Sequence, residues 1–144
     1  MELWFYIAKF GDCTDKIIAT WTRGPYSHVE MFFPDGECFS SSPRDGGVRF
    51  KKINRSNKWS SIKLSIDYNE NIRKDCEKYV GLPYDWYGCM GLTLGFSRIE
   101  EKNKWYCSEI CAFILNKYGA ELPSKVSPNT LYKKMINGSK FRIH

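Results

Sequence analysis

Histidine is scarce in this 144-residue chain: His28 is the only internal one, and His144 is the last residue. Close cysteine pairs are missing as well, because no Cys-x-x-Cys sequence occurs. Structural zinc sites take four cysteine or histidine ligands, mostly in such pairs. We therefore expect no metal and no other cofactor. A reaction that needs an imidazole is expected to use His28.

The chain also lacks a long apolar run and a recognisable targeting segment. Its apolar stretches are much shorter than the ~20 residues that cross a bilayer. Residues 3–8 are apolar, but Glu2 precedes them, and neither a basic region nor a small-residue cleavage site accompanies them. We therefore expect no transmembrane segment and a cytoplasmic location, with export by a signal-independent route left open.

The composition predicts one folded domain over residues 1–144. Hydrophobic residues make up 42% of the chain and aromatic residues 16%, which excludes a disordered protein. The net charge of +6 is compatible with a polyanionic partner. However, the basic residues are scattered, and no nucleic-acid-binding motif accompanies the short clusters at 49–52 and 133–134. We interpret them as a solvated surface and regard nucleic-acid binding as the weakest functional alternative.

Six cysteines raise the question of their role. Without a secretory signal we expect the thiols to stay reduced, and most of them to be small buried side chains. Cys107 differs, because it begins the most clearly periodic helix of the chain, expected over residues 107–118. At a helix N-terminus the free N–H groups and the helix dipole favour a thiolate. The sequence therefore predicts Cys107 as a nucleophile, with a buried structural cysteine as the alternative.

Short strands precede most of the expected helices, which predicts an α+β domain with an antiparallel sheet. Strands are expected at residues 3–8, 27–33, 37–42, 48–53 and 61–66. Helices are expected from Thr14 or Asp15 to about Gly24, at 67–80, at 107–118 and after Ser127, with an aromatic-rich segment at 81–94. The expected inward residues are Ile17, Ile18 and Trp21 in the first helix, Ile72, Cys76, Tyr79 and Val80 in the second, and Ile110, Cys111, Ile114 and Leu115 in the third.

The strand at 27–33 is expected to form a hairpin with the strand at 37–42. Its alternation places His28, Glu30 and Phe32 on one face, and Pro34-Asp35-Gly36 is a turn signal. If Phe33 pairs with Glu37, then Glu30 lies opposite Ser40 and His28 opposite Ser42. A slip of one residue would exchange the two faces.

Four motifs follow one another along the chain: Ser27-His28-Val29, Asp35-Gly36, Gly81-x-Pro83-Tyr84-Asp85 and Tyr106-Cys107-Ser108-Glu109. In this order they resemble the circularly permuted NlpC-type papain-like cysteine hydrolases, including the YiiX-like proteins and, more distantly, the lecithin retinol acyltransferase-like enzymes. In that branch the histidine precedes the cysteine. The resemblance spans residues 27–118. It implies a papain-like core whose antiparallel sheet packs against the nucleophile helix, with Cys107 as nucleophile and His28 as base.

The resemblance also implies a third polar residue that orients the imidazole. Counting through the hairpin places it at Ser40, where histidine, glutamate or asparagine is the more usual occupant. Glu30 is the alternative, because it shares the face of His28, although it can equally be an edge-strand surface charge. Glu109 lies in the first helical turn, where we expect its carboxylate to interact with the helix dipole rather than to take part in catalysis.

Several residues are candidates for binding a substrate. Arg44 lies in the polar loop after Ser40 and is predicted to contact an acidic substrate group, with an ordinary surface loop as the alternative. Tyr26 and Trp105 are predicted to contribute to the cleft. Trp86 and Tyr87 are further candidates for its walls, although aromatic residues in such numbers are more often core residues.

The function predicted from these observations is a cysteine hydrolase of the peptidase or amidase kind. It would act on a peptide, amide or acyl-ester substrate through an acyl-enzyme intermediate. Two alternatives remain open: an acyltransferase with the same Cys107–His28 dyad, and a catalytically weak papain-like module that binds or inhibits a partner. The small size is also compatible with a bacteriophage or other mobile-element protein. The natural substrate, the oligomeric state and the host stay open.

Overall fold

The computed structural model describes residues 1–87 and 103–138, and these form an α+β fold with a five-stranded antiparallel sheet. Within them this confirms the predicted α+β class with its antiparallel sheet. Cys89, His144 and the end of the expected aromatic-rich segment lie outside the described residues. The strand order is β4-β3-β2-β1-β5. The elements are β1 (Glu2–Ile7), η1 (Ala8–Phe10), α1 (Cys13–Trp21), β2 (Tyr26–Phe32), β3 (Glu37–Ser42), β4 (Gly47–Lys52), β5 (Trp59–Lys63), α2 (Glu70–Glu77), α4 (Cys107–Lys117) and α5 (Pro128–Asn137).

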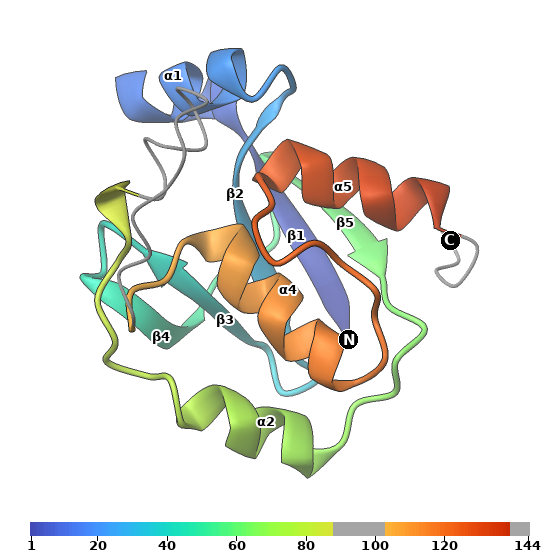
Figure 1. Ribbon diagram of the computed structural model, residues 1–144. Coiled ribbons are helices and arrows are strands. Elements are labelled where there is room, and N and C mark those ends of the chain that lie inside the picture. Colours follow the sequence, from blue (N-terminus) through green and yellow to red (C-terminus); the bar gives the residue numbers. More distant parts are fainter. Residues whose placement is uncertain (88–102, 139–144) are drawn as a thin grey trace.

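The core lies between the sheet and two of its helices. In Figure 1, α4 and α5 cover one face of the sheet, α1 lies beyond one end of β2, and α2 lies towards the other end. The alternate residues Leu3, Phe5, Val29 and Met31 of the two central strands are fully buried, which follows from the period-two alternation of a strand. The buried stripe of α4 is the predicted one, comprising Ile110, Cys111, Ile114 and Leu115.

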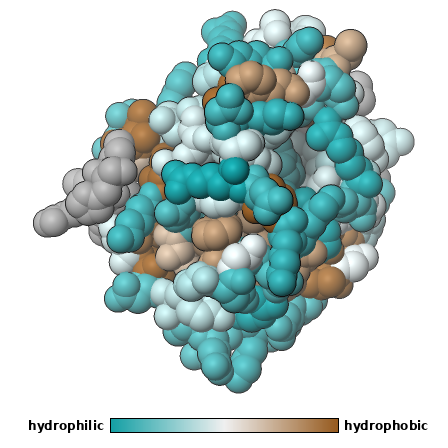
Figure 2. Space-filling view, turned by 180° about the vertical axis from the view of Figure 1, so that it is seen from behind, coloured by the Kyte–Doolittle hydropathy of each residue, from teal (hydrophilic) through white to brown (hydrophobic). Residues whose placement is uncertain are grey.

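The hairpin between β2 and β3 has the predicted register. Its ladder pairs Met31 with Phe39 and Phe32 with Cys38. The amide of Phe33 donates to the carbonyl of Glu37 at 2.9 Å, so the turn closes where the sequence places it. His28 and Glu30 alternate along β2 with the core residues Val29 and Met31, and Glu30 is itself buried. Figure 2 shows the molecule from behind, where hydrophilic side chains predominate around small separate hydrophobic patches.

The first helix is rotated relative to the prediction. Ile18 is buried as expected, but Ile17 and Trp21 are each 55% exposed, so their inward placement is wrong. The reason is Asp15, which is buried and accepts a hydrogen bond from the Ser27 hydroxyl at 2.6 Å. This contact turns the side of α1 that holds Asp15 and Ile18 towards β2. The N-cap is Asp12 rather than Thr14 or Asp15, since its side chain accepts from the amide of Asp15.

Helix α2 is shorter than the predicted 67–80. Its N-cap is Asn69, whose side-chain oxygen accepts from the amides of Asn71 at 3.0 Å and Ile72 at 3.2 Å. This cap fixes the first turn later than the apolar pattern suggests. Ile72 and Cys76 are buried as predicted, whereas Val80 is 47% exposed and lies after the helix, so its inward placement is wrong.

Candidate active site

Cys107 is the first residue of α4, and the backbone just before it is held by the Gly81-x-Pro83-Tyr84-Asp85 motif. The amide of Trp105 donates to the carbonyl of Pro83, and the amide of Asp85 donates to the carbonyl of Trp105, each at 3.1 Å. Tyr84 and Trp105 form an isolated parallel bridge. The motif therefore forms a short stretch of extended chain beside the residues that lead into Cys107.

This motif is itself anchored on β4. The amide of Val48 donates to the carbonyl of Leu82, and the amide of Gly81 donates to the carbonyl of Val48, both at 2.9 Å. Gly47 makes this close approach possible. Its φ is +143°, and a Cβ added there would lie 2.1 Å from the carbonyl oxygen of Leu82.

The first turn of α4 is fixed by hydrogen bonds from both directions. The Ser108 hydroxyl donates to the carbonyl of Val126. The amide of Tyr106 donates to the Glu109 carboxylate at 3.4 Å, which keeps a negative charge near the helix N-terminus. This placement agrees with the structural role expected for Glu109.

His28 lies on β2 next to an irregularity that sets its orientation. The β1–β2 register shifts after the Tyr6–His28 pair, because the next pair is Ile7 with Tyr26.

Asn129 holds the start of β2, two residues before His28. Its side chain accepts from the amide of Tyr26 at 2.9 Å and donates to the carbonyl of Tyr26 at 2.7 Å. Sequence reasoning missed Asn129, because a single asparagine in the first turn of a helix gives no sign of a contact 103 residues away.

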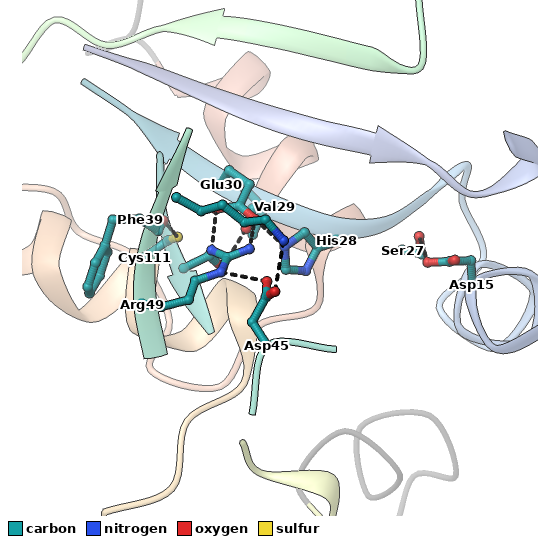
Figure 3. A network of polar contacts seen from close by, with 11 residues as sticks. Asp15, Ser27, His28, Val29, Glu30, Phe39, Asp45, Arg49 and Cys111 are labelled. Carbon is teal, nitrogen blue, oxygen red and sulfur yellow. Dashed lines mark hydrogen bonds and ion pairs between the residues drawn. The ribbon is translucent and has the colours of Figure 1, made fainter. Parts of the chain in front are cut away.

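The imidazole of His28 lies between a thiol and a carboxylate (Figure 3 shows the carboxylate side). Its Nε2 atom is 2.7 Å from Oε1 of Glu30, which leaves Nδ1 as the nitrogen that can exchange a proton with Cys107. Burial by itself lowers the pKa of His28. The neighbouring Cys107 and Glu30, through charge and hydrogen bonding, outweigh burial and raise the His28 pKa to about 10. The imidazole is therefore protonated at neutral pH.

The two candidates for orienting His28 have different partners. Glu30 is 1% exposed and contacts the imidazole directly. Burial raises the pKa of Glu30, but His28 and then Arg49 lower it below its ordinary value, so Glu30 stays a carboxylate. The Ser40 hydroxyl donates to the carbonyl of Val29 at 2.7 Å and so links β3 to β2. The geometry favours Glu30 as the orienting group.

Arg49 is a residue that sequence reasoning missed. It donates two hydrogen bonds to the Glu30 carboxylate and one to Asp45, at 2.7 to 2.8 Å. Arg49 pairs with Ser40 across β3 and β4. Extending the hairpin count by one strand would therefore have placed Arg49 on the face of Glu30 and His28.

The predicted substrate-binding residues have the following positions. Arg44 donates to Asp12 at 2.8 Å and to Asp15 at 2.7 Å, so two carboxylates already face its guanidinium. Tyr26 is 7% exposed and packs in the core. Trp105 packs against the rings of Tyr79 and Phe113, and within the described residues its indole N–H is buried without a hydrogen-bond partner.

Two cavities adjoin His28. The smaller, of about 190 Å³, is lined by Asp12, Thr14, Asp15, Ile18, Ser27, His28, Ser42, Pro43, Arg44, Tyr84 and Trp86. The larger, of about 390 Å³, is lined by Tyr6, His28, Glu30, Ser42, Arg44, Asp45, Arg49, Lys51, Lys52, Ile53, Asn54 and Trp59. Arg44 lines both, whereas Tyr26 and Trp105 line neither. Cys107 is 1% exposed and also lines neither of them.

Among the cysteine thiols of the described residues, that of Cys107 is the one that hydrogen-bonds the imidazole of His28. Burial raises the pKa of Cys38 and of Cys76 to about 12, whereas Cys13 is exposed on α1. Within residues 1–87 and 103–138, no cluster of three or more histidine, cysteine, aspartate or glutamate side chains could hold a metal ion. In the same residues no helix has the length and apolar character needed to cross a membrane.

Comparison with models of known protein families finds no match for this chain, and comparison with the sequences of curated proteins finds none either.

Proposed function

We propose that this chain is a cysteine hydrolase of the permuted NlpC-type, papain-like kind, which cleaves an amide or ester bond through an acyl-enzyme intermediate. The observation that carries this proposal is the placement of Cys107 at the first turn of α4 beside His28, whose Nε2 atom is held by Glu30 at 2.7 Å. A thiol at a helix N-terminus, a cation that stabilises its thiolate and a carboxylate that orients this cation are the parts of an activated cysteine nucleophile.

The first half of the reaction forms a thioester. The Cys107 thiolate attacks the substrate carbonyl, and the oxygen that becomes negative lies near the free N–H groups at the start of α4. His28 then gives its Nδ1 proton to the leaving amine or alcohol, and the carbon–nitrogen or carbon–oxygen bond breaks. Glu30 stabilises the protonated imidazole up to this step and holds its ring in place.

The second half releases the acid. Neutral His28 takes a proton from a water molecule, and the resulting hydroxide attacks the thioester carbonyl. The carbon–sulfur bond breaks, the carboxylic acid leaves, and the Cys107 thiolate and the His28 imidazolium are restored. The smaller cavity is our choice for the acyl group, because Tyr84 lines it and lies 6.0 Å, ring to ring, from Tyr106, the residue before the nucleophile.

The experiment that tests the proposal measures the rate of iodoacetamide alkylation of Cys107 against pH, in the wild type and in His28→Ala, with the modified sites located by mass spectrometry. We expect Cys107 to react faster than the exposed Cys13 below neutral pH in the wild type, and to lose this advantage in the variant. Cys13 is an internal control, because its rate should be the same in both proteins.

A second candidate function is a papain-like binding or inhibitory module with little turnover. The observation that favours it is the burial of Cys107, which is 1% exposed and lines neither cavity beside His28. In such a module Cys107 would react no faster than Cys13, and His28→Ala would leave its rate unchanged. That result would reject the hydrolase.

A further inference from the structure

Arg49 forms hydrogen bonds to both oxygens of the Glu30 carboxylate, which also contacts His28. Its Nη1 donates to Oε2 of Glu30 at 2.8 Å, and its Nη2 donates to Oε1 at 2.7 Å. The same Oε1 atom contacts Nε2 of His28 at 2.7 Å. The planar guanidinium thus matches both carboxylate oxygens and leaves Glu30 a single orientation, the one in which Oε1 faces the imidazole.

A second layer fixes Arg49 itself (Figure 3). Its Nε donates to Asp45 at 2.8 Å, and Asp45 accepts a further bond from Lys51 at 2.8 Å. The Arg49 side chain is only 15% exposed, so its three hydrogen bonds are largely shielded from water. Asp45, in the turn before β4, therefore fixes the guanidinium through its Nε atom.

The charges around His28 come from several elements. The charged ones are Glu30 on β2, Arg49, Lys51 and Lys52 on β4, Asp45 and Arg44 before β4, and Asp12 and Asp15 at the start of α1. The titratable thiols and phenol are Cys107 on α4, Tyr6 opposite His28 on β1, and Cys38 and Cys111, which interact with Glu30. Arg49 is the one cation in this set that bonds Glu30 besides His28. Arg44 is occupied by Asp12 and Asp15.

A buried imidazolium–carboxylate pair has a neutral alternative, in which the proton moves from the histidine to the carboxylate. Burial favours this neutral form, because two charges are removed from water. With Arg49 in place, however, a protonated Glu30 would disrupt the two hydrogen bonds to the guanidinium and leave it Asp45 as its one anionic partner among these groups. Arg49 therefore makes the charged form of the His28–Glu30 pair the stable one.

We propose that Arg49 is a positioning residue of the dyad: by holding Glu30 as an oriented carboxylate, it keeps the proton on His28 and so keeps Cys107 a nucleophile. This inference rests on the proposed hydrolase function. It assigns Arg49 no contact with substrate; its effect passes through Glu30 and then His28. Asp45 has a weaker effect of the same sign, because it fixes Arg49.

The test compares Arg49→Gln and Arg49→Lys with the wild type by two measurements. One is the titration of the His28 ring followed by NMR, which is simple because the chain has two histidines and His144→Gln identifies the other. The second is the pH profile of Cys107 alkylation. For Arg49→Gln we expect the His28 titration midpoint to fall from about 10 to neutral pH or below, because the proton moves to Glu30, and Cys107 alkylation at neutral pH to drop about 10-fold. The rise of the Cys107 alkylation rate with pH should begin at a higher pH than in the wild type.

Arg49→Lys keeps the positive charge but loses the paired hydrogen bonds of the guanidinium to the two oxygens of Glu30. It should restore most of the titration midpoint while the alkylation rate stays several-fold low, which separates charge from orientation. The matched control is Arg73→Gln, which removes an arginine that also bonds two carboxylates, Asp35 and Glu37, at the other end of the hairpin. It should change neither readout. A purely structural role of Arg49 would lower the stability and leave both pH profiles in place.

The outcomes separate this inference from the function on which it rests. If His28→Ala lowers Cys107 alkylation but folded Arg49→Gln keeps the wild-type profiles, the inference is overturned and the hydrolase stands. If His28→Ala itself has no effect, the hydrolase fails. Should Arg49→Gln not fold, Arg49→Lys and Asp45→Asn decide: an unchanged alkylation rate and profile in both would overturn the inference.

Discussion

Cys107 and Cys111 lie one turn apart on α4 and are equally buried, yet their neighbours differ. The two residues are 1% and 0% exposed. Sγ of Cys111 lies 3.9 Å from the carbonyl oxygen of Phe39, and burial, followed by the charge of Cys107, raises the Cys111 pKa well above its ordinary value. Cys107 instead begins the helix beside His28. Burial is therefore the same for the two thiols, and what distinguishes Cys107 is the neighbouring His28 and its place at the helix start.

The largest expected effect comes from removing each thiol in turn. Cys107→Ala should reduce acylation of the protein by an activated ester by about 1,000-fold or more, because no other described thiol lies beside His28. Cys111→Ala should leave acylation within about threefold of the wild type. The mass increase of the intact protein measures both. Equal losses in the two variants would erase the distinction between the two cysteines.

A smaller effect is expected from Glu30→Gln, which removes the carboxylate that contacts His28, the residue that distinguishes Cys107 from Cys111. Alkylation of Cys107 should fall about 10- to 100-fold. The free energy of unfolding should fall by about 3–5 kcal/mol, because the buried Arg49 and His28 lose the carboxylate between them and Arg49 keeps only Asp45. Urea unfolding and mass spectrometry measure the two quantities.

Ser40→Ala is the matched comparison for Glu30→Gln. It removes one hydrogen bond, to the carbonyl of Val29, and should cost about 1 kcal/mol of stability without moving the pH profile of Cys107 alkylation. A shifted profile in Ser40→Ala together with an unshifted one in Glu30→Gln would make Ser40 the orienting residue.

The cation that distinguishes Cys107 from Cys111, protonated His28, should also make the stability of the fold depend on pH. Its pKa is about 10 in the fold, against an ordinary value of 6.5, so folding favours the charged imidazole. The resulting stabilisation is fully present below about pH 6.5 and is lost as the pH rises through 10. The difference in unfolding free energy between the wild type and His28→Ala should be on the order of 1–3 kcal/mol below pH 6.5 and shrink above it. A difference that stays constant over this range would contradict the assigned charge.

A few-fold effect on Cys107 is expected from Gly47, which anchors the segment that leads into the first turn of α4. Gly47→Ala would place a Cβ 2.1 Å from the Leu82 carbonyl, so the segment must shift, at a cost of about 1–3 kcal/mol. We expect the alkylation rate of Cys107 to fall a few-fold. Gly46→Ala is the control, because Gly46 also has positive φ, +81°, but nothing lies within 4 Å of its added Cβ. Equal effects of the two variants would show that backbone strain alone is responsible.

The alternation along the strands and the turn signal were enough to predict the sheet and the register of the β2–β3 hairpin, because these depend on neighbours in sequence. The apolar stripe of α4 and the capping Ser127 of α5 were predictable for the same reason. Helix α1 was not, since its rotation depends on a hydrogen bond from Ser27 to Asp15 that apolar periodicity does not reveal.

The candidate site divides in the same way. Cys107 and His28 were predictable from residue type, helix start and motif order, whereas Glu30 was predictable from the strand face that it shares with His28. Arg49 could have been found by counting one strand further. Asn129 could not, because its contact with Tyr26 joins distant parts of the chain, and no pattern in a single sequence records such a contact.

That contact ties the strand of His28 to the start of α5. Tyr26 is held at both its amide and its carbonyl by a side chain that comes 103 residues later. A chain made from its N-terminus on the ribosome exposes His28 long before Asn129 exists. The contact that fixes Tyr26, at the start of the strand of His28, can consequently form only after the first turn of α5 has been synthesised, when both His28 and Cys107 are already in the chain.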